Sequence, residues 1–223
     1  MDIAIIFICI LLIPCILYII ISSIYSKYSD VNNKIKLSGF EVARKILDSH
    51  GLEKVYIVEI KSNLNDHYDY DHKVLRLSSD VFHGETLTAA VVAAKIASYA
   101  VQDKEGYSFM KFRSVVNKIM TFVNYIAYIL FVTGLALQDV SILEMANYFI
   151  VFVLLFHLVT LPVEYDACNR AKKDLTKCDI LSKKEIEEVD NVFKVLPYTF
   201  IMSIVTCIST LVNELMYNIQ RRG

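Results

Sequence analysis

Few residues of this chain could bind a metal ion. Its 223 residues include five histidines, at His50, His67, His72, His83 and His157. No two of them lie four residues apart, the spacing that places two imidazoles on one helix face toward a shared ion. A metal site built from these histidines is therefore not indicated. Surface or hydrogen-bonded side chains are the simpler interpretation.

A second chemical arrangement is a serine close to a lysine. Ser98 follows Lys95 by three residues in an alanine-rich stretch, so on a helix the two side chains share a face. A hydrolase of this kind also needs an oxyanion hole and a lysine made neutral by burial. No pattern in the sequence indicates either, so a serine–lysine dyad is not favoured.

The five cysteines do not suggest a disulfide framework. Cys9, Cys15 and Cys207 lie inside apolar runs, where cysteine acts as a small core residue. Cys168 and Cys178 flank a basic stretch. An odd number of thiols in these settings predicts reduced cysteines.

The composition is that of a membrane protein. The chain is 55% hydrophobic, and its mean hydropathy is +0.45. Its length allows one modest soluble domain and a few spans. The net charge of -1 gives no reason to expect a nucleic-acid partner.

Four apolar runs divide the chain into segments. Ile3–Ile24 is uncharged over 22 residues, about 33 Å of helix, which is enough to cross a bilayer core of roughly 30 Å. No positive charge precedes it, so residues 1–24 are predicted to be an uncleaved anchor. Residues 115–163 hold two further runs joined by a short loop, 138–147. Residues 198–223 hold the fourth run and a tail, and whether this run crosses completely stays open.

The basic residues predict the orientation. Of 23 lysines and arginines, 13 lie in segment 25–114 and seven in segment 164–196, while loop 138–147 has none. The positive-inside rule places both charged segments in the cytosol and the amino terminus outside. Arg221 and Arg222 then end outside, against the rule. The chain is thus predicted to be a multi-pass protein of the cell membrane whose main soluble domain is cytosolic.

The two charged segments are predicted to fold differently. Segment 25–114 contains a short amphipathic helix at 40–50, strand candidates at 55–60 and 73–77 that form a small strand pair, a polar turn at 65–71, and a long helix at 86–102. Segment 164–197 has a charged, helical pattern and carries Glu164. A solvated helix pair is the simpler interpretation of it. A basic patch attracted to anionic lipid is the alternative.

Several separate stretches are similar to one known family. They are Asp66–Asp69, Val74–Ser78, Ala89–Ala94, Ala100–Tyr107, Lys111–Ser114 and Leu158–Ala167. In order and spacing the chain resembles the YugP-type neutral zinc metallopeptidases of bacteria, from the first apolar run to the fourth. The resemblance implies a mainly α membrane protein of about four transmembrane helices. It also implies a cytosolic zincin-like α+β domain.

The resemblance also implies a site on the long helix. In that family this helix carries HExxH, whose histidines bind zinc and whose glutamate acts as general base, and a later glutamate completes the ligands by analogy with other gluzincins. The register given by the flanking alanines puts Lys95 at the first histidine, Ile96 at the glutamate and Tyr99 at the second histidine. The later glutamate is kept as Glu164.

The replacements cannot do the original chemistry. A lysine ammonium has no lone pair for a metal, isoleucine has no proton to exchange, and tyrosine is a poor zinc ligand at its usual pKa of about 10. We therefore expect no catalytic residue and no cofactor here, although the parent family uses zinc. If any residue touches a metal, it is Glu164. Candidate cleft residues are Asp66, His67, Tyr68 and Asp166.

Charge balance suggests what stands in the place of the metal. Without zinc, Glu164 would be an unpaired buried carboxylate, which is costly. We predict an ion pair between Lys95 and Glu164, with the Tyr99 hydroxyl as a second donor. The alternative is a Lys95 side chain that extends to solvent.

The function expected from the sequence is that of a pseudo-peptidase. Such a protein would bind, scaffold or regulate a membrane protein, a peptide or an active paralogue within the bilayer. The first alternative is a membrane zinc metallopeptidase with an unconventional site. The second is a purely structural membrane component.

Overall fold

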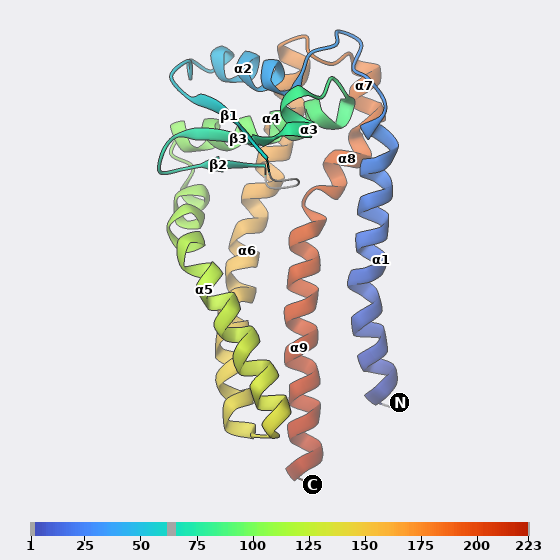
Figure 1. Cartoon of the computed structure of the whole chain (residues 1–223), viewed down its shortest axis with the longest axis vertical. Helices are drawn as coiled ribbons and strands as arrows, with labels where there is room; N and C mark the ends of the chain where they lie inside the picture. Colours follow the sequence, from blue (N-terminus) through green and yellow to red (C-terminus); the bar gives the residue numbers. More distant parts are fainter. Residues whose placement is uncertain (1–2, 62–65, 223) are drawn as a thin grey trace. The chain divides into compact units, whose positions relative to one another are not determined.

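The computed structural model describes residues 3–61 and 66–222, which form a mainly helical protein with one small sheet (Figure 1). In chain order the elements are α1 (Ile3–Ser29), α2 (Gly39–Ser49), β1 (Tyr56–Ile60), β2 (His67–Asp69), β3 (Val74–Ser78), α3 (Ser79–His83), α4 (Leu87–Lys104), α5 (Ser108–Leu137), α6 (Val140–Lys177), α7 (Lys183–Glu188), α8 (Asp190–Val195) and α9 (Tyr198–Arg222). The helical class predicted from the sequence is confirmed.

The chain divides into two compact units. The sheet unit comprises Ile20–Lys111 and Val163–Pro197. The apolar unit comprises the residues up to Ile19, Phe112–Pro162 and the residues from Tyr198 onward.

The sheet of the sheet unit has three strands in the order β1-β3-β2. β1 pairs with β3 in parallel, Tyr56 opposite Val74, and β2 pairs with β3 antiparallel, His67 opposite Arg76. The predicted strand pair is present. The predicted polar turn at 65–71 was wrong for 67–69, which form β2, and Asn65 lies outside the described residues. β3 supplies backbone partners to this polar stretch, and Tyr68 buries its ring against the core.

Helix α2 covers the core of the same unit through one face. Its start is fixed by a capping box in which Ser38 Oγ accepts from Glu41 N at 3.3 Å and Glu41 Oε2 accepts from Ser38 N at 2.8 Å. Its buried side chains are Val42, Ala43, Ile46 and Leu47. This spacing is that of a helix with a single apolar face. The predicted helix at 40–50 is therefore confirmed.

Helix α6 corrects the predicted loop at 138–147. The chain is helical from Val140 onward, because Asp139 Oδ1 accepts from Ser141 N at 2.8 Å and so satisfies an exposed amide of the first turn. The turn from α5 is tight: a Cβ on Gly134 would lie 2.9 Å from the Leu143 side chain. α6 then continues through Pro162, so the predicted boundary at 163/164 falls inside one helix.

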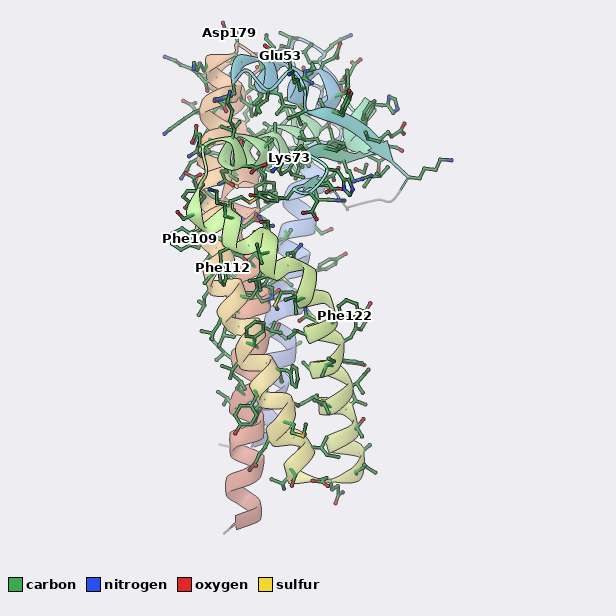
Figure 2. All side chains as sticks on the ribbon, turned by 90° about the vertical axis from the view of Figure 1, so that its left-hand side faces the viewer. Glu53, Lys73, Phe109, Phe112, Phe122 and Asp179 are labelled. Carbon is green, nitrogen blue, oxygen red and sulfur yellow. The ribbon has the colours of Figure 1, made fainter. Side chains whose placement is uncertain are left out.

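The apolar unit contains the helices suited to a membrane. Among the described residues, two stretches are long and apolar enough to cross a bilayer, Val140–Lys177 and Asp190–Ser209. The two halves of α5, Ser108–Asn117 and Phe122–Gly134, meet at 56° and give a third if they act as one span. On α5, Phe112 and Phe122 project away from the ribbon (Figure 2) and are 49% and 70% exposed. Side chains of this kind suit a lipid environment.

Packing within the apolar unit joins α5 to α6. Met120 and Val123 of α5 form a buried cluster with Val153 and Phe156 of α6.

Candidate functional site

Helix α4 is the central element of the sheet unit. Its start is capped by Thr86, whose Oγ1 accepts from Ala89 N at 3.1 Å. Every residue from Leu87 to Gln102 is buried. A helix buried on all sides needs small or apolar side chains, which explains its alanines and makes its polar residues conspicuous. The helix predicted at 86–102 is confirmed.

Three side chains meet at the middle of α4. Lys95 Nζ lies 2.6 Å from Glu164 Oε2, and the Tyr99 hydroxyl donates to Glu164 Oε1 at 2.7 Å. Lys95 and Tyr99 are one helical turn apart, so both face α6, where Glu164 lies. Glu164 is 0% exposed and the Lys95 side chain 10%. The ion pair expected from the sequence is present, and Lys95 does not extend to solvent.

Electrostatics keep this site charged. Burial alone lowers the pKa of Lys95, but the neighbouring Tyr99, Glu164 and Cys168 raise it, and the net shift is upward. Lys95 is therefore an ammonium at neutral pH, balancing the Glu164 carboxylate. Ile96 is 4% exposed and contributes only apolar packing.

A second set of contacts extends the polar face of α4. Gln102 is fully buried and donates to Val163 O at 3.0 Å and to Asp166 Oδ2 at 2.8 Å. Asp166 also accepts from Arg170 Nε at 2.5 Å. Sequence reasoning did not single out Gln102. Its position three residues after Tyr99 was the available signal, because that spacing returns to the same helix face.

The other candidate cleft residues have structural partners of their own. Asp66 accepts from Ser78 N at 2.7 Å, which ties the approach to β2 to the end of β3. His67 lies in β2. The Tyr68 hydroxyl donates to Asp103 at 2.7 Å, and burial together with this contact raises the pKa of Tyr68. The structure thus brings Asp166 to the α4–α6 contact and uses Asp66 and Tyr68 to fasten the sheet.

The residues at the α4–α6 contact do not fit a zinc ion. Zinc sites use thiolates, neutral imidazoles and carboxylates, usually three or four together. Here the carboxylate oxygens of Glu164 face an ammonium and a hydroxyl donor. Among residues 3–61 and 66–222, no group of three or more histidine, cysteine, aspartate or glutamate side chains is placed to hold a metal. No chemistry through a metal is derived for this site.

The architecture and the sequence together define the class. The family model described as "Putative neutral zinc metallopeptidase" matches residues 3–218, and the chain belongs to this family. Its sequence contains no HExxH. The resemblance stated from the motifs is confirmed.

Among curated proteins, the chain is similar to the "Putative membrane protease YugP" of Bacillus subtilis (strain 168). The two are 29% identical over 196 residues, which cover 88% of this chain and 87% of the relative. No solved structure matches the sequence significantly.

Proposed function

We propose that the chain is a membrane-embedded pseudo-peptidase, inactive as a zinc enzyme, that acts by binding. The observation that carries this proposal is the Lys95–Glu164 ion pair with its Tyr99 hydrogen bond. By the resemblance, Lys95 and Tyr99 stand where the family's motif would supply its two histidines. An ammonium there repels a metal cation and satisfies the carboxylate that would bind it.

The retained frame supports a binding role. The family match runs over residues 3–218, so the elements around the site are present although the motif is not. A protein with this frame and no hydrolytic group can hold a membrane protein, a peptide or an active paralogue without cleaving it. Binding, scaffolding or regulation is thus the proposed activity.

The proposed topology has four spans and a cytosolic sheet unit. It is supported by α1, which contains the uncharged run Ile3–Ile24, and by the apolar character of α5, α6 and α9. The lysine and arginine distribution supports the orientation. Reporter fusions after residues 31 and 139 should report the inner and outer sides respectively, and the reverse pattern would overturn the orientation.

Metal analysis of the purified full chain tests the loss of zinc. The matched control is the variant Lys95→His/Ile96→Glu/Tyr99→His, which rebuilds the motif next to the native Glu164. We expect far less than one zinc per wild-type chain, and about one per chain in the rebuilt variant, since three protein ligands are then available. Stoichiometric zinc in the wild type that is lost in Glu164→Gln would overturn the proposal.

A peptidase assay separates the proposal from a metallopeptidase with an unconventional site. The wild type should not cleave an unfolded membrane substrate with or without added zinc. Cleavage that requires Glu164 would establish the alternative.

Capture from membranes tests the binding role. The tagged chain should retain a specific membrane partner after crosslinking, and the same partner should be retained by the rebuilt variant. If no partner is enriched over an unrelated four-span protein, a purely structural role replaces the binding role.

A further inference from the structure

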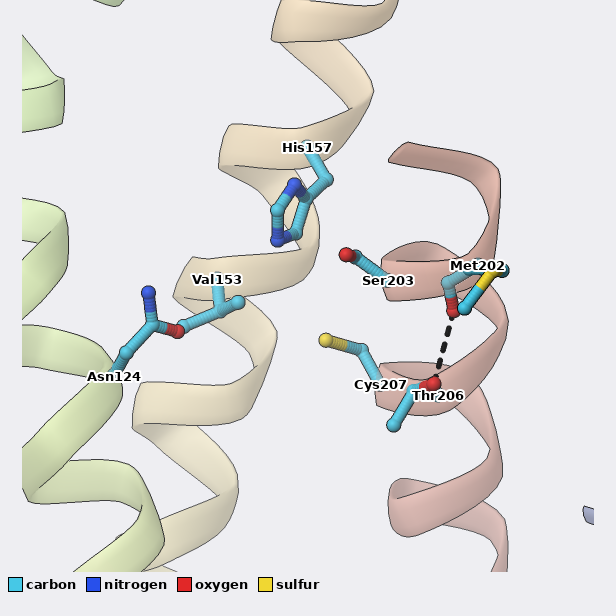
Figure 3. A pocket seen from close by; sticks show the side chains of 7 residues that line it. All are labelled: Asn124, Val153, His157, Met202, Ser203, Thr206 and Cys207. Atoms are coloured by element: carbon cyan, nitrogen blue, oxygen red, sulfur yellow. Dashed lines mark hydrogen bonds between the residues drawn. The ribbon is translucent and has the colours of Figure 1, made fainter. Parts of the chain in front are cut away.

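An open cavity of the apolar unit lies between three helices. Its volume is about 240 Å³, and it is lined by Asn124 of α5, Val153 and His157 of α6, and Met202, Ser203, Thr206 and Cys207 of α9. In Figure 3 the side chains of Asn124, His157, Ser203 and Cys207 point into the same space. Three helices thus bring hydrogen-bonding groups to one place.

These polar groups lie on helices that are otherwise strongly apolar. The most apolar windows of α6 and of the stretch Asp190–Ser209 have mean hydropathies of 2.1 and 1.7. Polar side chains at such positions are costly in a bilayer and usually face a functional cavity. Their gathering at one cavity therefore requires an explanation beyond packing.

His157 is the key residue of the cavity. Its Nδ1 is buried and has no hydrogen-bond partner among the described residues. The ring contacts Phe156 and Phe200, with centroids 5.8 and 6.0 Å away. Both phenylalanine rings pack against the imidazole, but neither has an oxygen or nitrogen atom that could accept a hydrogen bond from it. By contrast, the Thr206 hydroxyl is already bonded to Met202 O at 2.9 Å.

The lining also defines the charge of the occupant. Of the seven described side chains that line the cavity, none is a lysine, arginine, aspartate or glutamate. Among these lining side chains, a phosphate or carboxylate would find no cation and an ammonium no anion. An amide, an imidazole, a hydroxyl and a thiol suit a neutral carbonyl or hydroxyl.

We propose that this cavity binds the neutral, hydrogen-bonding head of a lipid-soluble molecule, with His157 and Asn124 as its polar contacts. The apolar tail would extend along the lipid-facing side of the helices. The cavity is slightly smaller than the roughly 300–1,000 Å³ of typical small-molecule pockets, which suits a head group rather than a whole ligand. Diacylglycerols and quinones share this chemistry. The proposal does not depend on the fate of the zinc site.

The experiment measures thermal unfolding of the full chain in detergent by far-ultraviolet circular dichroism. The probes are dioctanoylglycerol, menaquinone-4 and, as an anionic comparison with the same tails, dioctanoyl phosphatidic acid. At saturation, a neutral probe should raise the Tm by about 5 °C, and phosphatidic acid should not. Whichever neutral probe acts identifies the head as a glycerol ester or a quinone ring.

Variants then locate the effect. His157→Phe should weaken the response on the order of tenfold in probe concentration, and Ser203→Ala less. Thr160→Val is the matched control: its hydroxyl bonds within α6 to Phe156 O and does not line the cavity. The control should respond like the wild type. Bound probe should also slow alkylation of Cys207 by N-ethylmaleimide while leaving Cys178, in the sheet unit, unchanged.

Two results would overturn the proposal. One is the absence of a Tm shift with both neutral probes. The other is an equal Tm shift in the wild type, His157→Phe and Ser203→Ala. This result would mean that the probe stabilises the apolar unit without binding in the cavity.

Discussion

The two units differ in the partners that their buried polar side chains have. In the sheet unit, Glu164 forms an ion pair with Lys95 at 2.6 Å and a hydrogen bond with Tyr99 at 2.7 Å, in a core closed to solvent. In the apolar unit, His157 lines an open cavity and its Nδ1 has no hydrogen-bond partner among the described residues. The first arrangement joins three side chains to one another, whereas the second leaves one imidazole nitrogen able to bond another molecule.

This difference distinguishes buried polar side chains that stabilise the fold from buried polar side chains that are available to bind another molecule. A buried group with its partners in place makes the fold specific, and removing one partner leaves a charge exposed to a low dielectric. A buried group without a partner has lost its bond to water and gains none from the fold, so replacing it breaks no stabilising contact. The four predictions below test this contrast, from the largest expected effect to the smallest.

Removing the lysine should have the largest effect. Lys95→Ala leaves Glu164 without its counter-charge and should lower the free energy of unfolding by about 3–5 kcal/mol, roughly 10 °C in Tm for a chain of this size. Thermal melts in detergent measure it. Lys95→Met should behave similarly because it keeps the volume and loses the charge.

The double variant Lys95→Met/Glu164→Leu is the control for that prediction. It removes both charges and should regain most of the lost stability, since an apolar pair can replace a buried ion pair. If Lys95→Ala and Lys95→Met both melt like the wild type, the pair has no energetic role and the contrast between the units fails.

The second effect concerns the hydroxyl of Tyr99. Tyr99→Phe removes one hydrogen bond to a charged acceptor and should cost about 1.5–3 kcal/mol. The ring stays in place, so packing is preserved. Combined with Lys95→Met, the loss should be clearly non-additive, because both side chains act on the same carboxylate. Simple additivity would indicate that Tyr99 stabilises through its ring alone.

The third effect is a pH dependence in a more exposed part of the sheet unit. Burial opposes ionisation of Asp69, but hydrogen bonds from His72 and Arg76 outweigh it and lower its pKa from 3.8 to about 2. A lowered pKa means that this stabilisation is present above pH 3.8 and is lost as the pH falls toward 2. Its size should be no more than about 1 kcal/mol, since Arg76 is partly solvated. Asp69→Asn should flatten the stability curve in this window.

The smallest effect is expected at the cavity. Without ligand, His157→Phe should change the free energy of unfolding by no more than about 0.5 kcal/mol in either direction. The imidazole has no hydrogen-bond partner at Nδ1 among the described residues, so its loss breaks no such bond there. A loss comparable to that of Lys95→Ala would show that His157 is a structural residue, and the contrast would disappear.

Much of the fold followed from simple patterns. The alanine-rich stretch predicted α4, and the amphipathic pattern at 40–50 predicted α2. β2 could not be predicted from its own three residues, because its conformation comes from pairing with β3. The start of α6 was missed because Asp139 was interpreted as a loop residue, whereas it caps the helix.

The ion pair of the site could be predicted, because a buried carboxylate needs a counter-charge. A carboxylate at Glu164 and a lysine on the facing helix could neutralise each other, and they do. The hydrogen-bond partner of Gln102 could not be predicted. A side-chain amide can form hydrogen bonds with many kinds of group, and the sequence does not select among them. The cavity at His157 was hidden for a similar reason: Asn124, His157 and Ser203 lie on three helices far apart in the sequence.

The Lys95–Glu164 contact has a further consequence for the folding equilibrium. A metal that neutralises a carboxylate enters that equilibrium by mass action, so stability then varies with the concentration of free ion. A cation carried on a side chain of the same molecule has a fixed effective concentration, which no dilution or chelator can change. The stability of this contact is therefore set by the chain alone, whatever the supply of zinc around it.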